Sequence, residues 1–194
     1  MNPFLTPQQQ DRLVLASRSP RRIEILRGLG FEFEIEPAPE HLEDDAEHHD
    51  PHEIARMLAV RKSEFVALTR ARDRVLGADT IVIVDNTVLQ KPRDDAEARE
   101  FLSRLSGRTH TVVTGIAIHH GGHTSTGAER TQVTFRRLTP RQIAAYVATG
   151  EGRDKAGSYA AQGIGAGLIR RIEGCFFNVV GLPVGLLLDL MQQE

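Results

Sequence analysis

The chain has 194 residues, a length that fits one domain or one compact two-lobed domain. Hydrophobic residues make up 40% and charged residues 26% of it, as in ordinary soluble globular proteins, and such a chain can bury a core without disulfides or metals. The formal net charge of −2 excludes a global attraction to nucleic acid or anionic membrane, and the single cysteine excludes an intramolecular disulfide. No signal peptide and no apolar stretch of about 18 residues is found, so we expect a cytoplasmic protein with neither nucleic acid nor membrane as partner.

Residues 1–11 are polar and carry prolines, which predicts a loose leader ahead of a single folded region over 12–194. Hydrophobic periodicity, capping residues and turn residues predict the elements that follow. We expect strands over 13–16, 31–35, 75–84, 88–89, 109–118 and 131–138, helices over 20–29, 51–70, 96–105, 140–150 and beyond Pro183, an acidic loop over 37–50, a polar turn over 119–124, and a glycine-rich stretch that leads to segments 165–172 and 176–180. Strands interleaved with helices, with hairpins among them, indicate an α/β (α+β) domain on a mixed sheet.

The first polar motif, Ser-Arg-Ser-Pro-Arg-Arg, begins at Ser17 between the first strand and the first long helix. Ser19 stands at the N-cap and Pro20 at the first helical position, so backbone N–H groups and the positive end of the helix dipole face the turn. Arg21 and Arg22 are unfavourably placed at that positive end, and the phosphate oxygens of a ligand would bind the amides, the serine hydroxyls and both guanidinium groups. The alternatives are a solvated basic helix start and, from the Ser-Pro-basic pattern, a segment that lies in the DNA minor groove, against which a single copy in an acidic protein argues.

Asp79 and Thr80 lie in the middle of an otherwise apolar strand, and Lys91 follows the next strand. A carboxylate is costly to bury there unless it is paired or bound to a metal. An antiparallel hairpin would carry Lys91 back toward Asp79. The two residues then form either a structural ion pair, or an aspartate that binds metal or acts as general base beside a lysine that binds phosphate.

The third motif is a glycine-rich stretch that begins at Asp154 and reaches Gln162 and Gly163. Its glycines would let the backbone approach a ligand closely, although flexible loops use glycine too. Tyr159 fits a base-binding pocket and a hydrophobic core equally well. The histidines near 48–52 and 119–123 have no fixed ligand geometry, and we interpret them as solvated surface side chains.

In this order and spacing, the chain resembles the Maf family of nucleoside triphosphate pyrophosphatases, also described as septum formation inhibitors. The resemblance extends over nearly everything from Leu13 to Leu187, and the pattern DKAG-x-Y-x-x-QG is similar to the branch that acts on dTTP and UTP rather than on 7-methyl-GTP. The matching stretches are LASRSPRR, LAVRKSEFVA, LGADTIVIV, VLQKPRDDAEAREFLSRLSGRTHTVVTGIAI, TFRRLT, YVATGEGRDKAGSYAAQG and FFNVVGLPV.

The resemblance implies a mixed twisted sheet with flanking helices and two lobes around a central cleft, an architecture similar to the inosine triphosphate pyrophosphatases and often a homodimer. It implies that a nucleoside triphosphate, either dTTP, UTP or a modified pyrimidine nucleotide, is hydrolysed to the monophosphate and pyrophosphate in a nucleotide-pool-cleaning role. The divalent cation would be Mg²⁺, with Mn²⁺ or Co²⁺ as substitutes. The rival interpretation is a nucleotide-binding regulator of cell division or septum formation with little hydrolysis.

By motif match, the resemblance makes Asp79 the active-site carboxylate and proton acceptor. The family's acidic segment after the second strand reads Glu-His-Leu-Glu here, and Glu43 is the best match for its metal-binding or catalytic glutamate, with Glu40 and Asp44 as substitutes. Asp79 and Glu43 would together hold the metal. Phosphate- and base-binding positions would fall on Arg21, Arg22, Lys62, Lys91 and Gln162, with Ser17 and Ser19 at the phosphates and Thr80 assisting at the base.

Overall fold

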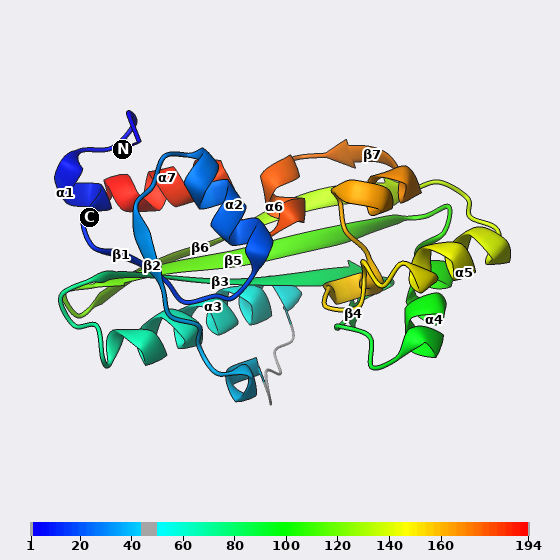
Figure 1. The fold of residues 1–194 in the computed structure, drawn as a ribbon, viewed down its shortest axis with the longest axis horizontal. Coiled ribbons are helices and arrows are strands. Elements are labelled where there is room, and N and C mark those ends of the chain that lie inside the picture. The colour runs from blue at the N-terminus through cyan, green and yellow to red at the C-terminus, as the bar shows by residue number, and fades with distance from the viewer. Residues whose placement is uncertain (1, 44–49, 194) are drawn as a thin grey trace. The chain divides into compact units, whose positions relative to one another are not determined.

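The computed structural model describes residues 2–43 and 50–193, without the side chains of residues 43, 51 and 52. Within these residues a seven-stranded sheet has the order β2-β1-β3-β5-β6-β7, and β4 pairs with β3 (Figure 1). The strands are β1 (Leu13–Leu15), β2 (Phe33–Ile35), β3 (Arg74–Val84), β4 (Thr87–Leu89), β5 (Thr109–His120), β6 (His123–Phe135) and β7 (Ile169–Glu173). Strand β1 is parallel to β2 and β3, whereas β4 is antiparallel to β3 and β7 to β6, so the predicted α/β class with a mixed sheet is confirmed.

The helices of the described residues are α1 (Pro7–Gln10), α2 (Pro20–Gly28), α3 (Pro51–Ala67), α4 (Asp95–Leu105), α5 (Pro140–Ala148), α6 (Phe176–Val180) and α7 (Val184–Gln192), with 3₁₀ helices η1 (Glu40–Glu43), η2 (Ala156–Ser158) and η3 (Gly163–Leu168). Helices α4 and α5 begin with side-chain caps. Asp94 caps α4 by accepting hydrogen bonds from the amides of Ala96 and Glu97. Thr139 and Gln142 form a capping box at α5.

The fold divides into two compact units. The first unit comprises Met1–Asp79, Thr114–Glu129 and Gly181–Glu194, and the second comprises Thr80–Val113 and Arg130–Val180. Strands β3, β5 and β6 each contribute residues to both units. As a result, two neighbouring candidate residues of β3, the aspartate at 79 and the threonine at 80, belong to different units.

In the first unit, helix α3 lies directly against the sheet at two glycines. A Cβ atom on Gly77 would stand 2.1 Å from the carbonyl oxygen of Ala59, and one on Gly115 would stand 2.2 Å from that of Ala55. Only glycine therefore permits this approach of α3 to β3 and β5. The largest fully buried apolar side chains of this unit are Leu13, Leu15, Leu26, Leu76, Ile116, Ile118, Leu182 and Leu187.

The second unit has an aromatic group at the centre of its core. His110 Nε2 lies 2.8 Å from Tyr159 Oη, and both rings meet Phe135 edge-on with centroid distances of 5.0 and 4.8 Å. Burial lowers the pKa of His110 to about 4 and raises the pKa of Tyr159. Tyr159, which the sequence leaves open between a pocket and the core, is a core residue.

The segment before β1 differs from the predicted loose leader. Thr6 and Gln9 form a capping box at α1, and the backbone amide of Asn2 donates to Gln10 Oε1 over 2.7 Å. Asn2 Nδ2 also donates to the carbonyl oxygen of Leu29 over 3.0 Å, which ties the segment to the end of α2. The capping box is a local sequence signal, but the contact with Leu29 joins residues 27 positions apart, which composition does not reveal.

The turn predicted over 119–124 is shorter in the structure. Gly121 and Gly122 adopt positive φ angles of 58° and 82°, and β6 begins at His123. The first half of β6 lacks apolar alternation, which is why periodicity did not predict a strand there. Thr126 Oγ1 donates to the carbonyl oxygen of Ile116 in β5 over 2.8 Å.

Candidate active site

Lys62 and Asp79 form a buried ion pair in the first unit. Lys62 Nζ lies 2.5 Å from Asp79 Oδ1, and the two side chains are 9% and 12% exposed. The second carboxylate oxygen, Asp79 Oδ2, makes no hydrogen bond to a described residue. An isolated buried charge is strongly unfavourable, so each of these two groups offsets the free-energy cost of burying the other. The lone pairs of Oδ2 remain for a ligand or a water molecule.

The close approach of α3 to β3 creates this pair. Lys62 follows Ala59 by three residues on α3, and Asp79 follows Gly77 by two residues on β3. These spacings place each charged side chain on the same face as the residue that makes the helix–strand contact. A side chain at position 77 would separate the two elements and, with them, the lysine and the aspartate.

The hairpin interpretation concerned Lys91, whereas the lysine that pairs with Asp79 in the first unit is Lys62. Strand β4 ends at Leu89, which is opposite Val82, and the carbonyl oxygen of Gln90 accepts a hydrogen bond from the amide of Gly157 over 3.1 Å. Lys91 follows, and its side chain is exposed in the second unit. The ion pair that the sequence predicts for Asp79 is made by Lys62.

Arg22 holds the turn between β1 and α2. Its Nε donates to the carbonyl oxygen of Gly181 over 2.8 Å and its Nη1 donates to Ser17 Oγ over 3.0 Å. Ser17 Oγ also accepts a hydrogen bond from the amide of Ser19 over 3.3 Å. Ser19 occupies the predicted N-cap position, but its hydroxyl caps no amide and makes no hydrogen bond to a described residue. The turn thus carries the Ser19 hydroxyl, the fixed guanidinium group of Arg22 and a half-exposed Arg21.

The acidic segment forms the 3₁₀ helix η1, which packs on α3. Arg61 Nη1 of α3 donates to the carbonyl oxygen of Leu42 over 3.4 Å. Glu40 is exposed and pairs with Arg18 at 3.6 Å. The side chain of Glu43 and the whole of Asp44 lie outside the described residues. The backbone that carries Glu43 therefore lies against the helix that carries Lys62.

The remaining candidates belong to the second unit. Thr80 is half-buried in β3, and Lys91 is exposed after β4. Gln162 is exposed between η2 and η3, and its amide makes no hydrogen bond to a described residue. Gly157, with a φ of +68°, would bring a Cβ to 2.9 Å from Val82 Cγ1, so the motif that begins at Asp154 packs tightly on β3.

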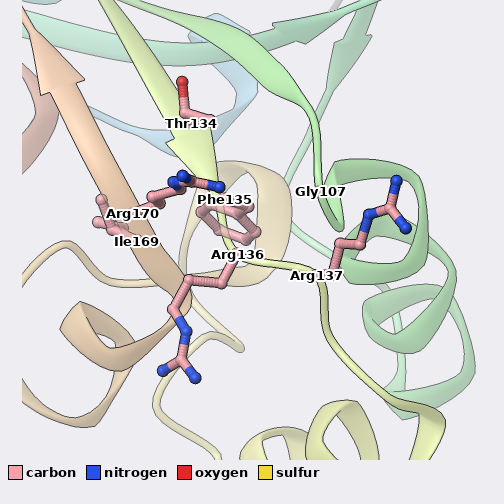
Figure 2. Close-up of a pocket in the computed structure, with 7 residues that line it drawn as sticks. All are labelled: Gly107, Thr134, Phe135, Arg136, Arg137, Ile169 and Arg170. Atoms are coloured by element: carbon pink, nitrogen blue, oxygen red, sulfur yellow. The ribbon is translucent and has the colours of Figure 1, made fainter.

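A depression of about 760 Å³ in the second unit carries charge that the sequence analysis did not single out. Figure 2 shows the guanidinium groups of Arg136, Arg137 and Arg170 pointing in different directions around it. Arg136 Nη1 donates to the carbonyl oxygen of Gly167 over 3.1 Å. These donors do not converge as they would on one phosphate. The lining residues are Gly107, Thr134, Phe135, Arg136, Arg137, Ile169 and Arg170.

The histidine clusters show no metal-binding arrangement in the described part of the chain, where no three His, Cys, Asp or Glu side chains gather as a metal site would. His119 Nδ1 lies 2.9 Å from Thr124 Oγ1. His48 and His49 lie outside the described residues, as does the side chain of His52. Across residues 2–43 and 50–193, no helix is both long and apolar enough to span a bilayer.

Comparison with known proteins gives consistent matches over nearly the whole chain. Residues 12–194 match the family model described as Maf-like protein. A protein of Moorella thermoacetica named dTTP/UTP pyrophosphatase is 50% identical over 177 residues, which are 89% of this chain and 90% of that protein. A protein of Symbiobacterium thermophilum with the same name is 47% identical over 183 residues, 94% of this chain and 93% of that protein. The solved structure of the Staphylococcus aureus Ham1 protein, at 16% identity and a TM-score of 0.52, covers 94% of this chain and 98% of that chain, which supports the fold alone.

Proposed function

Because the chain belongs to the Maf-like protein family, we propose that it is a nucleoside triphosphate pyrophosphatase that hydrolyses dTTP and UTP to the nucleoside monophosphate and pyrophosphate. Relatives that are 47% and 50% identical carry the name dTTP/UTP pyrophosphatase. The observation that carries the proposal is the buried pair of Lys62 and Asp79. It provides a carboxylate with one oxygen available for chemistry next to a cation in a nearly dry environment.

In the proposed reaction a water molecule attacks the α-phosphorus of the triphosphate. The bond from this phosphorus to the oxygen that bridges it to the β-phosphorus breaks, and pyrophosphate leaves with the electron pair of that bond. Asp79 Oδ2 accepts the proton of the attacking water. The ion pair with Lys62 fixes Asp79 Oδ1 at 2.5 Å from Nζ, so that Oδ2 keeps one orientation toward the water.

A divalent cation suits this arrangement. Mg²⁺ is usually bound by one or two carboxylates, water molecules and substrate phosphates rather than by a full protein cage. Asp79 would supply one such hard oxygen ligand through the second lone pair of Oδ1, which leaves Oδ2 as the proton acceptor, and Glu43 of η1 is the proposed second ligand. When bound, Mg²⁺ neutralises phosphate charge and lowers the pKa of the attacking water, and Mn²⁺ or Co²⁺ would substitute for it.

The phosphates of the substrate would bind at the turn before α2 and at the lysines. Arg22 is already oriented by Gly181 and Ser17, so little side-chain entropy is lost when it meets an anion. Arg21 and the Ser19 hydroxyl complete the proposed clamp for the β- and γ-phosphates. Lys62 and Lys91 would offset the charge that develops on the leaving pyrophosphate.

The pyrimidine would be recognised by Gln162. Its side-chain amide offers both a donor and an acceptor, which is what the edge of thymine or uracil requires. Gln162 is exposed and its amide makes no hydrogen bond to a described residue, which supports this role. Thr80 is the proposed second contact of the base.

The direct test incubates the purified protein with Mg²⁺ and, separately, dTTP, UTP, CTP, ATP and 7-methyl-GTP, and identifies the products by chromatography. Monophosphate and pyrophosphate from dTTP and UTP are the expected products. Orthophosphate as the first product would contradict the proposed reaction. Binding of dTTP without turnover would instead support the rival interpretation of a nucleotide-binding regulator.

A further inference from the structure

The carboxylate of Glu151, which follows α5, is the centre of a hydrogen-bond network in the second unit. Its Oε2 accepts hydrogen bonds from the Tyr146 hydroxyl over 2.9 Å and from the amide of Gly165 over 2.7 Å. Its Oε1 accepts from the amide of Ile164 over 2.9 Å. The Tyr146 oxygen in turn accepts from the amide of Ala160 over 3.1 Å. Glu151 and Tyr146 together hold both ends of segment 160–165.

The glycines of this segment fit closely around the carboxylate. A Cβ atom on Gly163, which has a φ of +63°, would stand 2.3 Å from Glu151 Oε1. A Cβ atom on Gly165 would stand 2.3 Å from the carbonyl oxygen of Ala160 and 2.7 Å from the Tyr146 oxygen. No other residue type fits at these two positions without displacing the network. The backbone of segment 160–165 is therefore shaped to fit the carboxylate of Glu151.

The charge state of Glu151 supports this role. Burial acts to raise the pKa of its carboxyl, but hydrogen bonds from Tyr146 and from the amides of Gly165 and Ile164 outweigh burial and hold the pKa below its ordinary value. Lys155 adds a favourable charge nearby, and its Nζ donates to the backbone carbonyl oxygen of Glu151 over 2.5 Å. An ionised carboxylate is an acceptor at both oxygens, which matches the donors that surround it.

The segment that this network holds carries one polar side chain, that of Gln162. Its neighbour Ala161 is buried, whereas Gln162 is exposed and its amide makes no hydrogen bond to a described residue. Nothing in the described residues orients this amide directly, so its position depends on the backbone that carries it. That backbone is fixed by Glu151 from one side and by Tyr146 from the other.

We propose that Glu151 is a positioning residue for substrate recognition: it fixes the backbone of segment 160–165 so that the amide of Gln162 meets the pyrimidine of the nucleotide. This inference rests on the proposed function, because it takes Gln162 as the residue that reads the base. Glu151 itself touches no substrate. Its loss weakens binding and pyrimidine selectivity and leaves the chemistry at Asp79 intact.

The test compares Glu151→Gln with Glu173→Gln, a matched change at an exposed carboxylate that pairs with Arg171 in the same unit. The first readout is the Kd, by calorimetry, of dTTP with a methylene group between its α- and β-phosphorus atoms, which reports binding whether or not the protein has turnover. The second readout is hydrogen exchange of segment 160–165 without nucleotide. In Glu151→Gln we expect Kd to rise about tenfold and exchange to quicken about tenfold, because one acceptor oxygen is replaced by a donor. Glu173→Gln should change neither.

Two further variants separate positioning from general loss of structure. Tyr146→Phe should shift Kd in the same direction, and Gln162→Ala should raise Kd without changing hydrogen exchange in the flanking residues. In the Gln162→Ala background, Glu151→Gln should add little further loss of affinity, since both act through one contact. An undiminished effect in that background, or a Kd for Glu151→Gln equal to that of Glu173→Gln, overturns the proposal.

Failure of the proposed function would look different. Absence of dTTP hydrolysis by the wild-type protein contradicts the assigned reaction, while the binding and exchange readouts still decide the role of Glu151. If Gln162→Ala leaves Kd unchanged in a protein that hydrolyses dTTP, the base is read elsewhere. The positioning role is then wrong although the reaction stands.

Discussion

Lys62 of α3 and Asp79 of β3 neutralise each other inside the first unit, with Nζ 2.5 Å from Oδ1. The proposed catalytic carboxylate is thus also one half of a buried structural pair. Catalysis and stability are therefore coupled at this position, and substitutions there must be interpreted with both effects in view.

A double-mutant cycle on this pair should show strong coupling. Asp79→Asn removes the negative charge beside a buried lysine, and Lys62→Met removes the positive charge beside a buried aspartate, so each single variant should lose about 3 kcal/mol of stability. The double variant removes both charges and should lose much less than the sum of the two. Urea denaturation of the four proteins measures the coupling. Additive losses would show that the pair contributes no mutual stabilisation.

Gly77→Ala should separate α3 from β3. Its Cβ would meet the carbonyl oxygen of Ala59 at 2.1 Å, and a backbone atom cannot rotate away, so we expect a loss of about 3 kcal/mol together with reduced turnover. Gly28→Ala is the matched control, because a Cβ there has no heavy atom within 4 Å. Thermal unfolding and dTTP turnover of both variants test this expectation. Equal midpoints for the two variants would show that the approach of α3 is not tight.

Arg22→Ala should weaken nucleotide binding and destabilise the turn before α2. The carbonyl oxygen of Gly181 and the hydroxyl of Ser17 would lose a charged donor, which should cost about 2 kcal/mol. Arg27→Ala, at the exposed end of the same helix, should change neither property. The Kd of the methylene-bridged dTTP and the unfolding midpoint are the two measurements. An unchanged Kd in Arg22→Ala would mean that this arginine only holds the turn.

The stability of the protein should decline in acid because of His110. Burial lowers the pKa of this residue to about 4, whereas in the unfolded chain its pKa is close to the ordinary value of 6.5. Between these values the unfolded state binds a proton that the folded state does not, so stability is full above pH 6.5 and falls as the pH drops toward 4. The loss should reach about 3 kcal/mol.

The variant His110→Gln, which keeps a polar group beside Tyr159, should flatten this pH dependence. His123→Gln is the control, because that histidine is exposed and its loss should leave the slope unchanged. Denaturant titrations at several pH values between 6.5 and 4.5 give the comparison. A wild-type slope in His110→Gln would assign the acid sensitivity to other groups.

Much of the fold follows from local sequence rules. Prolines and capping residues such as Thr139 mark helix starts, and the apolar run up to Val84 marks the central strand. The sequence also identifies Asp79 as an unusual buried carboxylate, and Lys62 enters through the family resemblance. Both lie together in the structure.

Other features depend on contacts between distant parts of the chain. The hairpin rule concerns only Lys91, whereas the ion pair of Asp79 with Lys62 joins α3 to β3 across 17 residues of sequence. No local sequence pattern assigns a role to Glu151, although this residue lies within the matching stretch YVATGEGRDKAGSYAAQG. Its role follows from the hydrogen bonds that it accepts from the amides of Ile164 and Gly165, which lie 13 and 14 positions further along the chain.

The central claim is that Asp79 directs water to the α-phosphorus of a pyrimidine triphosphate. The most direct measurement is hydrolysis of dTTP in H₂¹⁸O, with mass spectrometry of both products, for the wild-type protein and for Asp79→Asn at a temperature where the variant is folded. We predict ¹⁸O in dTMP and none in pyrophosphate, and a rate for Asp79→Asn below about a tenth of the wild-type rate. Label in pyrophosphate, or a rate above that level in the folded variant, would contradict the account.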